Sequence, residues 1–311
     1  MSTLDFFTQA DPELDAVATE LLGIDPTGMR WAEVIRHTFD MLYNGQETGR
    51  YRWDQLYKTE KTHFGTLFEI NGQREFGFYD GEEMDFQIAG VDVDAKWSQK
   101  SGGWMLPPES FGHLVLVGTA NDEQSTWSIG LARVSEENRR VAVNRDGKTT
   151  LSALGREAVR WLWKDAALSP NVLLQLPRAT VDQILESRSG QEKILRLLRA
   201  AEGRIIRRTT IATVGRQLDP MKRLRASGGA RTRLRPEGYL VLTGDYHAEL
   251  AKSFGVAVPG RGEVVAFRVV PAEDGGVFLS DRNWRRATVD DAVNVEAPLL
   301  PASRSASFEQ E

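Results

Sequence analysis

The spacing of apolar residues divides the first half of the chain into two helices followed by strands. Residues 11–23 and 30–43 carry apolar side chains at helical spacing, so each range predicts an amphipathic helix. Apolar runs bounded by polar turn residues predict strands at 84–97, 113–120 and 126–134. The first half is therefore predicted to be α/β, a mixed sheet with flanking helices.

The middle of the chain is predicted to be mostly helical. A helical pattern covers 152–168, and the segment 169–177, an apolar run bracketed by prolines, has the composition of a linker. Helical spacing returns over 182–187, 192–218 and 220–227. We therefore expect a boundary between two domains near the proline-bracketed segment.

The last third ends in strands. Apolar runs at 239–245 and 263–272 predict two strands, after a pair of glycines that ends the helical pattern. Helices followed by a β-hairpin, with positive charge on the last helices, are typical of a winged helix-turn-helix. The fold predicted for the whole chain is thus α/β (α+β), with a second domain of this DNA-binding type.

The composition narrows the class of protein. Of 311 residues, 41% are hydrophobic and 27% charged, as in a soluble globular protein. No apolar run approaches the roughly 18 residues of a membrane span, and the N-terminus is acidic, so we expect a cytoplasmic protein without membrane partners. There is no cysteine, which excludes disulfides and thiolate chemistry, and the four histidines are scattered.

The charge is unevenly distributed. Between residues 188 and 235 there are 14 basic and 3 acidic residues, a local net charge of +11, whereas the rest of the chain carries −16. A basic block in an acidic chain is typical of a surface that binds a polyanion. The sequence therefore predicts DNA binding by the second domain.

The strand predicted at 84–97 carries charges that need partners. Strand alternation places Asp92, Asp94 and Lys96 on one face, and Asp85 lies just upstream of a turn or bend. Ionised groups in such a strand are costly unless they are paired or bind a metal. We expect Asp94, Asp85 and the carbonyl of Ala95 to hold a divalent cation, with Lys96 next to the attacking water. Oxygen ligands favour Mg²⁺ or a similar ion.

An acid two residues before a lysine is by itself a weak signal. Composition alone predicts roughly 1.3 such pairs in this chain, and two occur: Asp94 with Lys96, and Asp146 with Lys148. The second pair lies in an Asp-Gly turn and is interpreted as solvated loop charge. For the first pair, a ladder of paired surface charges stays open as the alternative to a metal site.

Longer stretches carry a more specific signal. A resemblance to the NaeI-type (type IIE) restriction endonucleases, members of the PD-(D/E)xK nuclease superfamily, extends over the ranges 48–71, 74–76, 85–98, 102–113, 207–238 and 264–272. The resemblance extends over most of the chain. It implies a restriction-endonuclease-like core and a magnesium-dependent nuclease, with Mn²⁺ as a substitute for Mg²⁺.

The resemblance also assigns the catalytic residues. Glu69 matches the acid on the helix before the catalytic strands, which would hold a coordinated water or a second metal ion. Asp85 and Asp94 match the two metal-binding acids, and Lys96 matches the catalytic lysine. Asp92 is the spare acid. The implied metal ligands are Asp85, Asp94, Glu69 and Ala95.

Two groups of basic residues are candidates for DNA binding. One group precedes Glu69 in the sequence, and the other belongs to the basic block. They are Arg50, Arg52, Lys58, Lys61, Arg207, Arg208, Arg216, Lys222, Arg223, Arg225, Arg231, Arg233 and Arg235. For both groups a solvated surface is the structural alternative.

The resemblance implies the domain roles and the activity. We expect residues 1–164 to form an endonuclease domain, 165–171 a linker, 172–300 a winged-helix-like effector domain that binds DNA, and 301–311 a disordered tail. The implied enzyme is a homodimer that cuts both strands of a GC-rich palindrome and is activated by a second copy of the site. The alternatives are a retired or nicking relative, acting as a DNA-binding regulator or a repair nuclease.

Overall fold

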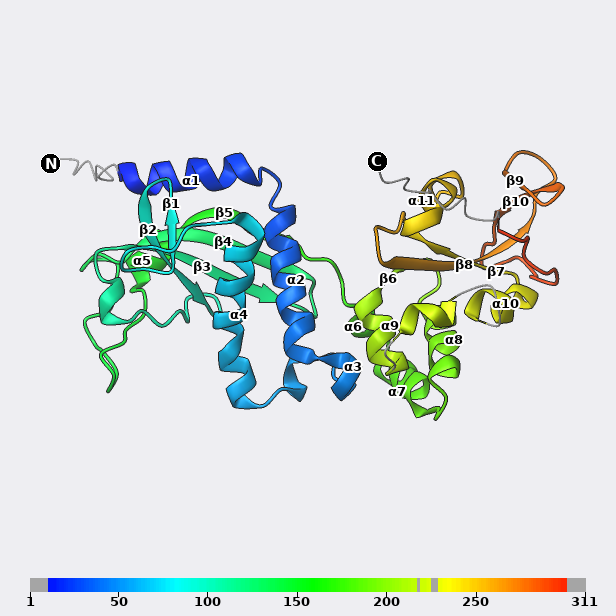
Figure 1. Cartoon of the computed structure of the whole chain (residues 1–311), viewed down its shortest axis with the longest axis horizontal. Helices are drawn as coiled ribbons and strands as arrows, with labels where there is room; N and C mark the ends of the chain where they lie inside the picture. The colour runs from blue at the N-terminus through cyan, green and yellow to red at the C-terminus, as the bar shows by residue number, and fades with distance from the viewer. Residues whose placement is uncertain (1–10, 217–218, 225–228, 301–311) are drawn as a thin grey trace, which may run out of the picture. The chain divides into compact units, whose positions relative to one another are not determined.

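The computed structural model describes residues 11–216, 219–224 and 229–300 (Figure 1). Two sequence predictions, DNA binding by Arg225 and a disordered tail at 301–311, lie outside the described residues. No described helix combines the length and apolar character needed to cross a membrane.

The contacts divide the chain into two compact units. The first unit comprises residues 1–42 and 56–170, and the second comprises 43–55 and 171–311. The second unit therefore includes a segment from the first fifth of the sequence.

The first unit is built on a five-stranded sheet in the order β1-β2-β3-β4-β5. β2 and β3 run parallel, and the other neighbouring strands run antiparallel. This confirms the mixed sheet that the sequence predicts. The strands are β1 (Phe86–Ile88), β2 (Val91–Trp97), β3 (Leu114–Asn121), β4 (Thr126–Arg133) and β5 (Arg160–Ala167).

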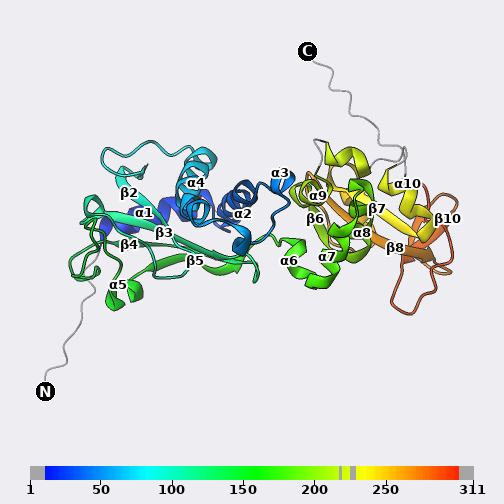
Figure 2. The same ribbon diagram turned by 90° about the horizontal axis from the view of Figure 1, so that it is seen from below.

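Helices α2 and α4 lie against the same face of this sheet (Figures 1 and 2). Phe64 of α4 stacks on Trp97 of β2 with ring centroids 4.3 Å apart, and both phenylalanines of α4 at positions 64 and 68 are fully buried. Such aromatic pairs add to the burial of apolar area, so α4 is held firmly against β2. The helices of this unit are α1 (Pro12–Ile24), α2 (Met29–Tyr43), α4 (Lys58–Phe76), η2 (Pro108–Ser110) and α5 (Ala153–Glu157).

The strand predicted at 84–97 is a hairpin of two strands. Ala89 and Gly90 connect β1 to β2 with φ of +54° and +76°. Two consecutive residues with positive φ are the requirement of a tight type I′ turn. Phe86 pairs with Val93, so the hairpin folds the start of β1 back beside the middle of β2.

The prediction of a helix at 152–168 is wrong over most of this range. Only Ala153–Glu157 is helical, and β5 follows from Arg160. Val159, Trp161 and Trp163 alternate with polar or half-exposed residues, which is the period of a strand. Pairing with β4 then decides the structure, because the Trp163 ring packs against Trp127 of that strand with centroids 5.8 Å apart.

The second unit contains a sheet in which β8 is central. β8 pairs with β6, β7 and β10, all antiparallel, and β10 pairs with β9. The strands predicted at 239–245 and 263–272 are confirmed as β7 and β8, whereas the hairpin of β9 and β10 was not predicted. The strands are β6 (Ile205–Arg207), β7 (Tyr239–Thr243), β8 (Glu263–Pro271), β9 (Val277–Leu279) and β10 (Arg282–Arg286).

Helices cover this sheet, and β8 contributes residues to two hydrophobic cores. Val264 and Ala266 belong to a core formed with α8 and α9, while Val265 and Phe267 belong to a second core that includes α11. The described helices are α3 (Gly45–Thr48), η1 (Trp53–Gln55), α6 (Val172–Gln175), α7 (Arg178–Glu186), α8 (Gly190–Ala200), α9 (Arg208–Gly215), η3 (Pro220–Leu224), α10 (Ala230–Leu234), η4 (Arg235–Glu237) and α11 (Gly244–Ser253).

The prediction of uninterrupted helical structure over 192–218 is wrong at the centre of this range. β6 interrupts it between α8 and α9, and Ile205 and Ile206 pair with Val265 and Val264 of β8. Apolar and β-branched residues are compatible with helix or strand over so short a run. The partner strand, far away in the sequence, decides between them.

The segment 43–55 packs in the second unit. Asn171 Nδ2 donates to the Tyr51 carbonyl at 2.9 Å, and the Arg216 guanidinium donates to the Glu47 carbonyl at 2.7 Å. Tyr51 is buried in the same core as α8 and α9. The boundaries expected from the sequence, 1–164 and 165–171, thus differ from these compact units, and β5 continues to Ala167.

A larger side chain at Gly45 is expected to release this segment. A Cβ at Gly45 would lie 2.0 Å from Oγ1 of Thr213 on α9 and 2.8 Å from the Arg50 carbonyl. We expect Gly45→Val to reduce the free energy of local opening of 43–55 by about 1–3 kcal/mol through overpacking. Amide hydrogen exchange over 43–55 measures this free energy. Gly23→Ala is the control, because a Cβ there meets nothing within 4 Å. Unchanged exchange in Gly45→Val would contradict the packing described.

Candidate active site

The β1–β2 hairpin and helix α4 bring the predicted catalytic residues into one region. Asp94 and Lys96 lie on β2, Asp85 immediately precedes β1, and Glu69 lies on α4. Asp85 Oδ2 accepts a hydrogen bond from the Ala95 N–H at 2.7 Å. The backbone of β2 therefore fixes the Asp85 carboxylate beside Asp94.

Lys96 is the centre of this cluster. Its Nζ donates to Asp94 Oδ1 and, at 3.1 Å, to the Ala95 carbonyl, and it lies 3.7 Å from Asp85 Oδ2. These three groups were predicted to hold a divalent cation. The ammonium thus lies where the predicted ligands converge, and it provides the positive charge that the two carboxylates require.

Burial shifts the protonation equilibrium of Asp94. The residue is 4% exposed, and burial raises the pKa of its carboxyl group to about 7; the neighbouring Asp85 carboxyl group acts in the same direction, and Lys96 opposes both. Asp94 Oδ2 is buried and has no hydrogen-bond donor among the described residues. A buried carboxylate oxygen without a donor is suited to a cation.

Glu69 is coupled to the same cluster. Burial raises the pKa of Glu69, the charge of Asp85 raises it further, and Lys96 lowers it. Among residues 11–216, 219–224 and 229–300, no three His, Cys, Asp or Glu side chains are grouped closely enough to hold a metal ion. The carboxylates of Asp85 and Asp94 and the Ala95 carbonyl are therefore the oxygen donors that lie closest together, and we call them the near donor set. Glu69 lies beside this set. Carboxylate and carbonyl oxygens suit a hard divalent cation such as Mg²⁺.

Asp92, the spare acid, has a different environment. Its two carboxylate oxygens accept hydrogen bonds from the N–H groups of Glu82 at 3.2 Å and Glu83 at 2.8 Å. These backbone hydrogen bonds, chiefly the one from Glu83, lower the pKa of Asp92. Asp92 therefore stabilises the turn that leads into β1.

The basic residues that precede Glu69 are divided between the two units. Arg50 and Arg52 belong to the segment 43–55 of the second unit, whereas Lys58 and Lys61 lie in the first turn and a half of α4. Arg52 pairs with Asp54 at 3.1 Å. The four basic residues therefore do not all belong to one compact unit.

Several arginines of the basic block have partners within the second unit. Arg207 pairs with Glu263 at 3.7 Å, Arg235 pairs with Glu296 at 2.6 Å, and Arg216 donates to the Glu47 carbonyl. These three side chains help to hold the fold. The described candidates of the basic block that are exposed to solvent are Arg208, Arg216, Lys222, Arg223 and Arg233.

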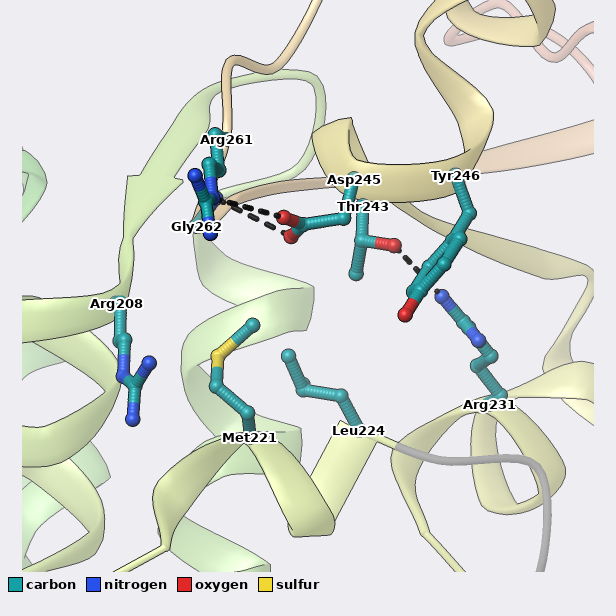
Figure 3. A pocket seen from close by; sticks show the side chains of 9 residues that line it. All are labelled: Arg208, Met221, Leu224, Arg231, Thr243, Asp245, Tyr246, Arg261 and Gly262. Carbon is teal, nitrogen blue, oxygen red and sulfur yellow. Dashed lines mark hydrogen bonds and ion pairs between the residues drawn. The ribbon is translucent and has the colours of Figure 1, made fainter. Parts of the chain in front are cut away.

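Two residues outside the sequence prediction lie with members of the basic block. Tyr246 and Arg261 line a cavity together with Arg208 and Arg231 (Figure 3). The only signal in the sequence is that Arg261 stands between two glycines, which is typical of an exposed turn.

In the first unit, β2 of a mixed sheet carries a carboxylate and a lysine beside a second carboxylate, an arrangement that suits hydrolysis of a phosphodiester at a divalent cation. The sequence model of the family described as restriction endonuclease NaeI matches residues 15–295. A curated relative, the type II restriction enzyme NaeI of Lentzea aerocolonigenes, is 47% identical over 307 residues, covering 95% of this chain and 96% of the relative. The chain therefore belongs to the NaeI restriction endonuclease family and is a type II site-specific deoxyribonuclease. Enzymes of this type generally use a divalent metal ion.

Proposed function

We propose that this enzyme cuts both strands of a GC-rich palindrome as a Mg²⁺-dependent homodimer and is activated by a second DNA copy bound to the second unit. The observation that carries the catalytic part is the buried Asp94 carboxylate, with one oxygen lacking a donor, beside Asp85 and Lys96. The resemblance to NaeI-type enzymes supports the other parts. DNA and enzyme would meet in the cytoplasm.

In the proposed site three residues would bind the metal ion and a fourth, Lys96, would donate a hydrogen bond. Asp85, Asp94 and the Ala95 carbonyl would hold Mg²⁺, which supplies charge stabilisation and lowers the pKa of a bound water. Lys96 holds its proton at Nζ and donates it as a hydrogen bond to the attacking water or to a phosphate oxygen. Its present contacts with Asp85 and Asp94 must loosen for this, since the same oxygens would face the cation.

Glu69 is proposed to orient a water molecule on the α4 side of the site. Its raised pKa makes it a better proton acceptor than an ordinary glutamate. Hydrolysis adds the water oxygen to phosphorus and releases the 3′ oxygen with a proton, which leaves 5′-phosphate and 3′-hydroxyl ends.

The energy required favours a metal ion at this site. Uncatalysed hydrolysis of a phosphodiester is so slow that the site must lower the activation free energy by on the order of 20 kcal/mol, whereas a lone general base lowers it by about 3–5 kcal/mol. The remainder must come largely from the charge stabilisation, activation of water and positioning that a bound cation would supply.

The second unit is proposed to be a winged helix-turn-helix that binds effector DNA. Supporting this, α8, β6, α9 and the basic segment around η3 and α10 precede β7 and β8, and the three strands take the order β6-β8-β7. Helix α11 lies between β7 and β8, where a simple wing would have a loop. Activation requires that effector DNA bind the cleavage-competent arrangement better than the idle one.

Cleavage at limiting Mg²⁺ is expected to fall as the pH decreases below about 7. The pKa of Asp94 is raised to about 7, so below that pH the carboxyl group binds a proton in place of the cation. We expect a loss of about tenfold per pH unit. Initial cleavage rates between pH 5 and 8 measure this. Saturating Mg²⁺ should move the midpoint to lower pH, because metal and proton compete. A midpoint near 4 at limiting Mg²⁺ would contradict the role of Asp94.

Digestion of DNA of known sequence tests the proposed function. The full chain is incubated with this DNA and Mg²⁺, and the break positions are mapped with and without added oligonucleotide duplex. Discrete double-strand ends at one palindrome, with faster cleavage on addition of that duplex, support the proposal. Single-strand nicks would indicate a repair-type nuclease, and binding without cleavage would indicate a retired relative.

A further inference from the structure

Helix α4 contains two glycines, and close packing explains one of them. A Cβ at Gly72 would lie 3.1 Å from the Trp31 ring, so the contact between helix and ring requires glycine there. A Cβ at Gly65 would meet, among the described residues, only the Cβ of Trp97, at the ordinary van der Waals distance of 3.8 Å. An alanine would therefore fit at position 65.

The backbone does not require glycine at position 65 either. Gly65 is helical and is not one of the glycines with positive φ. Glycine is the least favourable residue after proline in the interior of a helix, because it loses the most backbone entropy on folding. α4 therefore keeps a position without a side chain at a cost in stability.

This position lies on the flank of α4 that carries Glu69. The two residues are four apart, so they are neighbours on one face of the helix. A helical side chain leans back over the turn that precedes it, so the Glu69 side chain extends toward Gly65. Burial raises the pKa of Glu69, and the charges of Asp85 and Lys96 then act on it in opposite directions, so the carboxyl group lies within reach of the catalytic residues.

The packing of α4 on β2 keeps the space beside Gly65 open. Phe64 and Phe68 pack against the Trp97 ring, with ring centroids 4.3 and 5.0 Å apart, and both phenylalanines are fully buried. A close-packed contact of this kind prevents the helix from moving nearer to the strand. Gly65 itself is only half-buried, so water can enter the space.

A water molecule in this space would find polar partners. The Glu69 carboxylate is an acceptor, and a glycine leaves the helix backbone next to it open to solvent. A bound water needs two or more such partners. A methyl group at position 65 would take part of the same space.

We propose that the space beside Gly65 holds the water molecule that Glu69 orients during cleavage, so that Gly65 is a positioning residue. The water donates a hydrogen bond to the Glu69 carboxylate and contacts the backbone at Gly65. The inference rests on the proposed role of Glu69.

Gly65→Ala is expected to stabilise the protein and to slow cleavage. The melting temperature should rise by about 2–4 °C through the higher helix propensity of alanine. The cleavage rate at saturating DNA should fall by about 10- to 100-fold, because the water loses its position. Duplex binding without metal should be unchanged. Thermal unfolding, plasmid cleavage and gel-shift binding of the full chain measure the three effects.

Gly23→Ala is the matched control. It also replaces a helical glycine, in the last turn of α1, where a Cβ meets nothing within 4 Å among the described residues. Its cleavage rate should equal that of the wild type. A purely structural role of Gly65 would instead change stability and cleavage in the same direction, so a lower melting temperature together with slower cleavage in Gly65→Ala would overturn the proposal.

A double-mutant cycle with Glu69→Gln tests whether Gly65 acts through Glu69. Glu69→Gln keeps the shape of the side chain, removes its charge and should lower the cleavage rate by roughly 10² to 10⁴. In that background Gly65→Ala should lower the rate by less than about twofold, because two residues that position one water do not act additively. Additive losses would mean that the methyl group obstructs something other than this water, and the proposal would be wrong.

The same variants distinguish failure of the inference from failure of the proposed function. If Glu69→Gln slows cleavage and Gly65→Ala cleaves as fast as Gly23→Ala, only the inference is wrong. If Glu69→Gln cleaves at the wild-type rate, the proposed role of Glu69 is wrong, and the inference is overturned with it.

Discussion

Replacement of Asp94 by asparagine is expected to reduce DNA cleavage by on the order of 10³-fold or more while leaving duplex binding in the absence of metal unchanged. The asparagine side chain would preserve the shape of the aspartate but remove the negative charge and one anionic oxygen from the near donor set. The loss should therefore appear in the rate of cleavage at saturating DNA. Plasmid cleavage and gel-shift binding without metal measure the two effects.

The second acid-x-lysine pair of the chain supplies the control for this experiment. Asp146→Asn makes the same substitution in an exposed turn, where the Asp146 backbone, and not its carboxylate, makes the described hydrogen bond to Asn144. Its cleavage rate should equal that of the wild type. Full activity in Asp94→Asn would exclude Asp94 as a metal ligand, and equal losses in both variants would indicate an unspecific effect.

Replacement of Lys96 by glutamine is expected to lower the cleavage rate by roughly 10² to 10⁴. Unlike Asp94→Asn, this change should preserve or strengthen Mn²⁺ binding, because the Lys96 ammonium now occupies the space between Asp85 Oδ2, Asp94 Oδ1 and the Ala95 carbonyl. Loss of cleavage with retained metal binding would separate a catalytic role from a structural one. Calorimetric titration with Mn²⁺ and plasmid cleavage provide the two readouts.

Lys148→Gln, in the same exposed turn as Asp146, is the matched control for Lys96. Its cleavage and its affinity for Mn²⁺ should both remain at the wild-type level. If Lys96→Gln lost metal binding together with cleavage, the ammonium would be required to build the site, and its proposed role beside the water would be wrong.

The proximity of Asp85, Asp94 and Lys96 could be predicted because it depends on local structure. The three residues lie within twelve positions, and a two-residue turn at Ala89 and Gly90 folds one short strand onto the next. Strand alternation then places Asp94 and Lys96 on one face. Their roles in catalysis remain predictions, as does that of Glu69, whose place near the cluster depends on how α4 packs on β2.

The partners of the basic residues could not be predicted in this way. Arg231 and Arg235 each lie two positions from the exposed Arg233 on one short helical stretch, and nothing local distinguishes the three arginines. The carbonyls of Val241 and Ala297 and the carboxylate of Glu296, which lie on other elements, engage these two side chains. Charge density in the sequence therefore identifies a candidate DNA-binding region but not the side chains free to contact DNA.

By itself the sequence determined the family, the mixed sheet, the helices and strands with clear periodicity and the local cluster around Lys96. Only the tertiary structure decided that 160–167 is a strand, that 205–207 interrupts a helical run and that 43–55 packs in the second unit. The physical reason is the same in each case. Short apolar segments have similar intrinsic free energies as helix, strand or loop, and contacts with residues distant in the sequence select among them.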